Sequence, residues 1–408
     1  GTRPIPAATG IDRAHQGPTP MRIAINAWFL DRPGTGSGQY LQGLLRALPE
    51  FAREHQFLLA TPLEQPRLDV PGLQVEYWPF HSPRWRSNLG KLFFEQVAFP
   101  RVCRRWRAGV AHVPYWGSPL RSAVPTVVTI HDLIPLLLPA YRGGHLVRLY
   151  TRLVSASAQK AALVLTDSLA SKRDIERHLH LSPERVRCIY LAAGDQFDPQ
   201  PAPEDNAIRL SYGLPDTSLP AEPGRYVLYL AAHDLRKNVE SLVEAFATVA
   251  HADDDVILAI GGQLPAENDP VFFDPRHLVR ELGLADKVRF IGWVDEADKA
   301  AILRGAACAV FPSRYEGFGL PVLEALACGT PMIASSASSL PELLGDAGFA
   351  LDPDDVQGLA GAMLSCLVDE SLAAELRKRG PVQAARFSWS QTARQTLDAY
   401  LQAAAGRG

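Results

Sequence analysis

The chain has 408 residues, of which 47% are hydrophobic and 21% charged, and its net charge is −3. This length predicts two domains that each bury a core, and the composition is typical of a globular protein. No apolar run reaches the ~18 residues of a membrane span. Five widely spaced cysteines without a C-x-x-C pair argue against a disulfide framework or structural zinc, and favour the cytoplasm.

Charge is unevenly distributed along the chain. Residues 21–200 carry 22 Lys and Arg against 14 Asp and Glu, whereas residues 201–408 carry 17 against 29. The excess in the first half predicts an anionic surface or ligand there. No nucleic-acid motif accompanies it, so a nucleic-acid partner is not expected. Residues 1–20 lack the apolar stretch of a signal peptide and are interpreted as a disordered leader.

Strand-length hydrophobic runs alternate with helical patterns throughout, which predicts a parallel α/β architecture. In the first half a glycine-rich turn at 33–38 leads into an amphipathic helix with leucines on one face. The strands predicted in this half are 22–26, 110–113, 126–130 and 162–166.

A second series of elements follows a segment rich in Pro, Asp and Glu. That segment, 201–225, is predicted to be an interdomain linker. A helix is expected at 239–250, and the strands predicted in this half are 226–230, 256–260, 288–291, 309–312 and 331–334. Two doubly wound domains, 21–200 and 226–385, imply a ligand-binding cleft between the carboxyl ends of their strands.

The most informative stretch runs from Ser313 to Pro331. A strand ends before it, Glu316 lies in the following loop, and Pro321 suits the first position of a helix. The amides of Gly319 and Leu320 would then face a diphosphate at the helix N-terminus. Glu324 lies about 5 Å further along the axis, so the two carboxylates can flank that diphosphate. The alternative is a helix whose first turn simply carries acidic residues.

This stretch resembles the Glu–seven residues–Glu motif of retaining glycosyltransferases of family four, which have the GT-B fold. The resemblance extends over nearly all of residues 21–405. It implies two Rossmann-like domains facing each other, with a terminal helix in 386–408 crossing back to the first and Trp389 as its packing anchor. It also implies that Glu316 contacts the transferred sugar and Glu324 the ribose. The segment Gly317, Phe318, Gly319 and Leu320 would hold the donor.

A second motif, Leu235-Arg-Lys-Asn238, follows the first strand of the second half. Two adjacent cations at a strand end suit a leaving diphosphate. The alternative is a solvated charge pair beside the next helix. The family often places Lys here, with an Arg five residues upstream that follows a Gly, so the resemblance implies that Lys237 is catalytic. This chain has Ala231 and Ala232 where that Gly-Arg would stand, which leaves Arg236 as the second cation.

Two features of the first half complete the predicted site. Gly36, Ser37 and Gly38 resemble the family's loop over the cleft, near phosphate and acceptor, although a plain tight turn is the alternative. His131 ends a buried strand and resembles the family's active-site histidine, the alternative being a structural group. Asp132 would orient His131 or cap the next turn, and Asp167-Ser168 is interpreted as structural.

The main chain near Val294 is expected to contact the base, and Ser338–Glu342 resembles the loop beside the donor site. The resemblance implies front-face displacement with retention, and no D-x-D metal site is recognised, so neither cofactor nor metal is expected. His-Asp-Leu-Ile-Pro, Arg-Lys-Asn and Ser-Ser-Leu-Pro-Glu resemble bacterial polysaccharide mannosyltransferases. GDP-mannose is therefore the favoured donor, with a UDP-sugar as alternative.

Two other classes of function stay open, an epimerase or phosphorylase on the same scaffold and a non-catalytic binding module. The expected acceptor is a glycan, free or lipid-linked. Cationic-aromatic segments at 84–86, 91–94 and 101–107 predict peripheral association with the inner face of an anionic membrane. The alternative is that Phe93, Phe94 and Trp106 are core residues.

Overall fold

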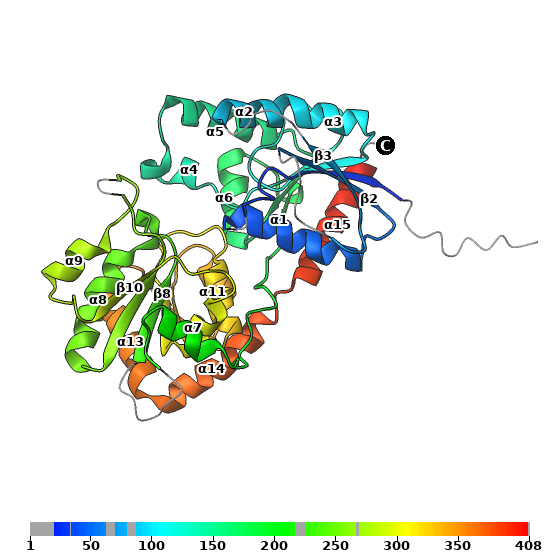
Figure 1. The fold of residues 1–408 in the computed structure, drawn as a ribbon. Helices are drawn as coiled ribbons and strands as arrows, with labels where there is room; N and C mark the ends of the chain where they lie inside the picture. Colours follow the sequence, from blue (N-terminus) through cyan, green and yellow to red (C-terminus); the bar gives the residue numbers. More distant parts are fainter. Residues whose placement is uncertain are drawn as a thin grey trace, which may run out of the picture.

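The computed structural model describes residues 20–32, 34–62, 70–79, 87–216, 225–266 and 269–406. They form two halves, each built on a parallel sheet with helices on both faces (Figure 1). This is the doubly wound α/β architecture that the alternating pattern predicts. The predicted disordered leader, residues 1–20, lies outside the described part except for Pro20.

The N-terminal sheet has seven parallel strands in the order β3-β2-β1-β4-β5-β6-β7. The strands are β1 (Arg22–Asn26), β2 (Gln56–Thr61), β3 (Gln74–Pro79), β4 (Val110–Val113), β5 (Thr126–Thr129), β6 (Leu163–Thr166) and β7 (Val186–Cys188). The four strands predicted from sequence are confirmed. The sequence analysis missed β3 and β7, which are half-buried edge strands, and β2, whose buried apolar run 57–60 was a usable signal.

The C-terminal sheet has six parallel strands in the order β10-β9-β8-β11-β12-β13. The strands are β8 (Arg225–Leu230), β9 (Val256–Gly261), β10 (Val288–Gly292), β11 (Cys308–Phe311), β12 (Met332–Ser335) and β13 (Gly348–Leu351). All five strands predicted here are confirmed to within one or two residues. The edge strand β13 was missed, because its side chains are only partly buried.

Helices connect the strands in both halves (Figure 1). Those before β8 are α1 (Gly36–Ala47), α2 (Asn88–Phe93), α3 (Phe99–Arg105), α4 (Ile134–Leu137), α5 (His145–Ala158), α6 (Leu169–Leu179) and α7 (Asp205–Ser211). Those after it are α8 (Val239–Ala252), α9 (Pro275–Glu281), α10 (Lys299–Gly305), α11 (Leu320–Ala327), α12 (Leu340–Leu344), α13 (Val356–Val368), α14 (Glu370–Ala384) and α15 (Trp389–Ala405). A π-helical turn, Phe94–Ala98, joins α2 to α3.

The segment predicted to be a linker is partly a packed helix. Within it, α7 lies against α10 of the C-terminal half. Arg304 forms an ion pair with Asp205 at 2.5 Å, and Arg209 donates to the carbonyl of Ala301 at 3.3 Å. The helix was not predicted because its sequence lacks apolar periodicity. It lacks that periodicity because it is attached to the C-terminal half mainly through charged groups.

Helix α15 returns to the N-terminal half, where it packs on α1 (Figure 1). The Tyr400 hydroxyl lies 2.7 Å from Nδ1 of the buried His112 on β4, and Thr392 donates to the carbonyl of Tyr190 at 2.6 Å. The indole of Trp389 rests on Gly43, where an added Cβ would come within 2.5 Å of the ring. The last helix therefore ties the two halves together.

The aromatic residues of the proposed membrane segment divide between core and surface. Phe94 and Trp106 are buried, and the Trp106 indole donates to Glu76 at 3.1 Å, so the core interpretation is correct for these two. Phe93 is exposed. Residues 84–86 lie outside the described residues. None of the described helices is both long and apolar enough to cross a bilayer.

Candidate active site

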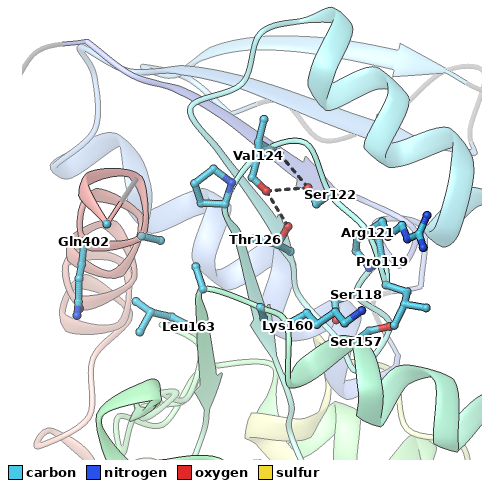
Figure 2. Close-up of a pocket in the computed structure, with 16 residues that line it drawn as sticks. Ser118, Pro119, Arg121, Ser122, Val124, Thr126, Ser157, Lys160, Leu163 and Gln402 are labelled. Atoms are coloured by element: carbon cyan, nitrogen blue, oxygen red, sulfur yellow. Dashed lines mark hydrogen bonds between the residues drawn. The ribbon is translucent and has the colours of Figure 1, made fainter. Parts of the chain in front are cut away.

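Two cavities of similar size lie at opposite ends of the strands. One, of about 670 Å³, lies at the amino ends of β5 and β6, lined among others by Ser118, Lys160 and Gln402 (Figure 2). The other, of about 640 Å³, lies where carboxyl ends of the strands face the opposite half. Ligands of doubly wound proteins bind at carboxyl ends, and only the second cavity contains residues predicted for the site.

Residues from both halves line this second cavity, hereafter the cleft. Gly34, Gly36 and Gln39 come from the start of α1. The C-terminal half contributes, among others, Arg236, Lys237, Trp293, Val294, Lys299, Leu320 and Glu324. Six predicted site residues thus line one cavity: Gly36, Arg236, Lys237, Val294, Leu320 and Glu324. The first and the last of them are separated by more than half the length of the chain.

Glu316 forms two short ion pairs at the edge of the cleft. Its Oε1 lies 2.6 Å from Nζ of Lys237, and its Oε2 lies 2.8 Å from Nη1 of Arg236. Burial favours the neutral carboxyl, but the two cations outweigh it, and the pKa of Glu316 lies below its usual value. Arg236 also pairs with Asp234 at 3.0 Å. The arrangement holds two cations and a charged carboxylate together in a buried cluster.

Local backbone geometry fixes this cluster. Lys237 ends a short 3-10 turn, after which Asn238 adopts a left-handed conformation with φ of 56°. The ammonium of Lys237 lies 4.6 Å above the ring of Phe311, the last residue of β11. The Ser338 hydroxyl accepts a hydrogen bond from the amide of Glu316 at 2.9 Å. The loop that resembled a donor-site loop therefore positions the motif glutamate.

Glu324 lies at the other end of the cleft in a different environment. Its Oε2 is 3.8 Å from Nζ of Lys299, which is itself bonded to Glu296 at 2.7 Å. Burial raises the pKa of Glu324 to about 7, since one shared and distant cation does not compensate for lost hydration. Glu324 is thus poised to change charge near neutral pH.

Helix α11, which carries Glu324, begins one residue earlier than predicted, at Leu320. Its N-cap Gly319 has φ of +117°, and a Cβ there would lie 2.6 Å from a methyl group of Leu340. Glycine is therefore required by both conformation and space. Phe318 is buried in the core, so its side chain faces away from the cleft and only its main chain could meet a donor.

His131 is held by two acceptors. Its Nδ1 lies 2.5 Å from Oδ2 of Asp167, and its Nε2 lies 3.2 Å from the carbonyl of Pro114. Both ring nitrogens therefore favour carrying a proton. Burial opposes the charged ring, but Asp167 outweighs it, and the pKa of His131 lies above its usual value. His131 does not line the 640 Å³ cleft itself.

Asp132 caps the turn and does not orient His131. Its Oδ1 accepts from the amide of Ile134 at 2.9 Å, so the second of the two interpretations is correct. Asp167, expected to be structural, instead holds the histidine. Its position at the end of the neighbouring strand β6 was the available signal, because adjacent parallel strands bring their carboxyl-end residues together.

Gly317 is a contact point between the halves. A Cβ on it would lie 2.4 Å from the carbonyl oxygen of His131, so only glycine fits. Its own carbonyl accepts hydrogen bonds from Ser168 at 2.7 Å and Ser171 at 3.0 Å. This contact places the Glu316 loop directly against the end of β5.

The predicted glycine turn is the first turn of a helix. Thr35 is the N-cap of α1, and its hydroxyl accepts from the amide of Gly38 at 3.2 Å. Gly38 is buried beneath the carbonyl of Arg32, and it lies outside the cleft lining together with Ser37. Gly36 alone of the three lines the cleft. The prediction of a loop here was wrong. The side-chain cap of Thr35 stabilises the start of the helix, so Gly36–Gly38 are helical although two of these three residues are glycines.

Tyr141 was missed by sequence reasoning. Its hydroxyl donates to Asp234 at 2.6 Å and accepts from the amide of Arg236 at 3.0 Å, so the N-terminal half holds the cationic loop of the other half. Glu342 makes a similar link, accepting from the amides of Leu169 and Ala170 at the start of α6. Nothing local in the sequence predicts partners so far apart along the chain.

In the part of the chain that the structure describes, no cluster of three or more His, Cys, Asp or Glu side chains has the arrangement of a metal site. The charged groups of the cleft are instead arranged as cations beside carboxylates.

Two facing parallel-sheet domains with this cleft define the GT-B class of glycosyltransferases, and solved structures agree. Sucrose-phosphate synthase from Thermosynechococcus elongatus superposes with a TM-score of 0.73 at 22% identity, covering 95% of this chain and 100% of that one. HepE of Anabaena, solved in complex with UDP and glucose, has a TM-score of 0.70 at 19% identity over 93% of this chain and 99% of its own. At these identities the likeness concerns the fold.

Sequence relatives identify the family. The Glycosyltransferase Family 4 model matches residues 34–193, and the Glycosyl transferases group 1 model matches residues 215–383. The O-antigen chain mannosyltransferase B of Escherichia coli is 32% identical over 93% of this chain and 99% of its own length. The MMP alpha-(1->4)-mannosyltransferase of Mycolicibacterium hassiacum is 28% identical over 94% and 99%. The chain belongs to the family-four, group 1 glycosyltransferases.

Proposed function

We propose that this glycosyltransferase moves mannose, with retention of configuration, from GDP-mannose to a glycan acceptor in bacterial polysaccharide synthesis. The observation that carries the proposal is the buried cluster of Lys237, Arg236 and Glu316 at the cleft edge. Such a cluster combines cations for a leaving diphosphate with a carboxylate for sugar hydroxyls.

The donor is proposed to extend along the cleft. Its diphosphate would lie against Lys237, Arg236 and the amides at the start of α11, where a helix N-terminus attracts anions. Diphosphate oxygens would replace Glu316 as partners of the cations, which frees that carboxylate to accept from hydroxyls of the sugar. Glu324 would accept from the ribose.

The base would occupy the end of the cleft lined by Val294 and Trp293. Val294 is buried and can contribute its main chain, as the family resemblance suggests. Trp293 offers a ring that is 62% exposed at the cleft, and a Cβ added to Gly34 of the other half would lie 3.5 Å from the edge of that ring. An exposed indole beside a cavity suits stacking on a purine or pyrimidine.

The proposed reaction is a front-face displacement. The acceptor oxygen forms a bond to C1 of the sugar as the bond from C1 to the diphosphate oxygen breaks. The acceptor's hydroxyl proton passes to that leaving oxygen. Lys237 and Arg236 stabilise the growing negative charge, which is the work that a magnesium ion performs in other transferases. We therefore propose a metal-independent enzyme without a cofactor.

His131 lies on the acceptor side, and Asp167 raises its pKa, which favours the protonated ring. Because Asp167 and Pro114 accept from its two nitrogens, the ring is held in one orientation at the joint with Gly317. We propose that it supports the developing negative charge electrostatically, since both ring nitrogens are already bonded within the protein. Its carbonyl lies against Gly317 of the Glu316 loop, so this role depends on the two halves lying against each other.

Mannose is favoured by what the relatives' names say of those proteins, since both the Escherichia coli and the Mycolicibacterium relatives are mannosyltransferases along nearly their whole length. We propose that the acceptor is a glycan carried on a lipid and that the enzyme works at the cytoplasmic face of the membrane.

Ligand-induced stabilisation tests the donor. GDP should raise the melting temperature more than UDP or ADP at equal concentration, because binding to the folded state stabilises by mass action. Incubation with GDP-mannose and a mannose-terminated oligosaccharide should then yield an α-linked product, read from the anomeric NMR signals. Preference for UDP would replace the donor, and a β-linked product would disprove retention.

A further inference from the structure

An exposed apolar face lies on two neighbouring helices of the N-terminal half. On α5, Leu146 is 83% exposed and Leu149, one turn further, is 63% exposed. On α2, Leu89 is 79% exposed and Phe93, again one turn further, is 46% exposed. Four large apolar side chains on one part of the surface indicate contact with an apolar partner. These four residues are called the α2–α5 face.

The two helices are joined side by side. The Tyr150 hydroxyl of α5 donates to the carboxylate of Glu95 at 3.0 Å, and Lys91 of α2 donates to the same hydroxyl at 3.3 Å. Glu95 is fully buried in this contact. Figure 1 shows α2 and α5 together on the side of the N-terminal sheet away from α1 and α15. The exposed apolar residues therefore lie on two helices that side-chain hydrogen bonds hold next to each other.

The surroundings of this face are cationic. Residues 87–166 contain ten Lys and Arg and only two acids, the buried Glu95 and Asp132, which caps a turn in the interior. On α5, His145, Arg148 and Arg152 follow at spacings of three and four, so they form a basic stripe beside the exposed leucines. Arg142 precedes the helix and is also exposed.

We propose that the α2–α5 face docks on the surface of an anionic phospholipid bilayer. Protruding leucines enter the boundary between headgroups and acyl chains while arginines on the flank reach the phosphates. A protein partner would not require a stretch of eighty residues whose only two acids lie inside the protein, whereas such a stretch suits a negatively charged membrane.

The position of the face suits a lipid-borne substrate. The chain enters α5 from the segment that carries Tyr141, whose hydroxyl bonds to Asp234 and the amide of Arg236 at the active site. The docked membrane would therefore lie beside the N-terminal wall of the cleft. The docking itself rests on the exposed face and does not depend on the identity of the donor.

This face coincides only in part with the segments that the sequence suggested, since Phe93 belongs to 91–94 while the leucines of α5 lie outside all three segments. Of the aromatic residues near the arginines at 101–107, Trp106 is buried, and Arg105 lies over the ring of Trp78 at 5.5 Å. The apolar groups that remain available are on α5 and α2. Sequence reasoning did not single out α5, because its leucines also fit a core-facing pattern.

Vesicle co-sedimentation of the full chain tests the proposal. The protein should sediment with vesicles of phosphatidylglycerol and phosphatidylcholine in equal parts, not with phosphatidylcholine alone, and less at high salt. The double variant Leu146→Ser/Leu149→Ser should lower the partition coefficient at least about tenfold, because two leucines no longer enter the bilayer. Arg148→Ser/Arg152→Ser should lower it by about thirtyfold on anionic vesicles.

Leu210→Ser/Leu282→Ser is the matched control, since both leucines are exposed on the C-terminal half. It should bind vesicles as the wild type does. All variants should keep the melting temperature and its increase with nucleotide, which separates failure of docking from failure of the proposed donor chemistry. No sedimentation at low salt, equal binding to neutral vesicles, or a dimer in light scattering that the leucine variants dissolve would each overturn the proposal.

Discussion

The two ends of the cleft each pair a buried glutamate with a lysine, but the pKa of one glutamate is lowered and that of the other is raised. Glu316 and Glu324 are eight residues apart, both are buried, and each faces a lysine. Glu316 has two cations within 2.8 Å, and its pKa is lowered. Glu324 has one lysine at 3.8 Å, already bonded to Glu296, and burial raises its pKa to about 7.

The difference shows that burial alone does not decide the charge of a carboxylate. The number and distance of the cations decide it, because both groups lose their hydration to a similar degree. The Glu316 end is a fixed charged cluster, suited to chemistry that moves charge. The Glu324 end can take up or release a proton near neutral pH, which suits reversible hydrogen bonding to a ligand.

The largest expected effect lies at the Glu316 end. Lys237→Ala and Glu316→Ala should each lower turnover by about 10² or more, because both groups act where charge develops in the transition state. Steady-state kinetics with purified variants measures this. Lys287→Ala, which removes a lysine paired with Asp254 elsewhere in the C-terminal half, is the control and should be fully active. Near-normal turnover of a folded Lys237 variant would exclude that residue from catalysis.

Substituting Glu324 should give a smaller effect of a different kind. Glu324→Gln should weaken donor binding by about tenfold, because an amide replaces a charged acceptor, and leave turnover at saturation much less affected. Titration calorimetry with the nucleotide, at a pH above 7, measures the change. Unaltered affinity would remove Glu324 from the donor site.

The same pair of residues makes opposite predictions for stability against pH. The raised pKa of Glu324 means that its contribution to ligand-free stability falls as pH rises from the usual carboxyl range through about 7. Glu324→Gln should therefore melt higher than wild type at pH 8, with the gain shrinking at pH 5. The lowered pKa of Glu316 contributes stability at pH 8, so Glu316→Gln should melt lower there. Shifts of the same sign at pH 8 would refute the comparison.

In the N-terminal half, changing the partner of His131 should shift the pH dependence of turnover. Asp167 raises the pKa of His131, so the protonated ring is present below that pKa and lost as pH rises through it. Asp167→Asn should move the alkaline limb of the turnover profile to lower pH, because the carboxylate that raises the pKa of His131 is removed. The exposed Asp195→Asn should leave the profile unchanged. An unmoved limb in Asp167→Asn would mean that the charge of His131 is not used.

The smallest expected effect is that of metal removal. If Lys237 and Arg236 stabilise the leaving diphosphate, exhaustive treatment with a chelator should leave turnover unchanged. Activity lost on chelation and restored by magnesium or manganese would show that the cations of the Glu316 end are insufficient.

Much of this site follows from local sequence. Glu316 and Glu324 can be placed from an apolar run of strand length, two glycines and a proline that starts a helix. These features put Glu316 in the loop after a strand and Glu324 in the helix that follows. The two cations come directly after another predicted strand. These features depend on neighbours along the chain, where periodicity and backbone propensity are informative. The same reasoning failed for Gly36–Gly38, where a single capping hydroxyl from Thr35 changed a turn into a helix.

The sequence by itself determined two parallel-sheet domains, the strand ends that carry the site, and the residue types that meet there. Only the tertiary structure decided which groups pair. Asp167 reaches His131 because β5 and β6 are neighbours in the sheet, and Tyr141 reaches Asp234 because the two halves close on each other. It also decided that Leu146 and Leu149 face outward, because a helix pattern alone does not reveal whether anything covers its apolar side.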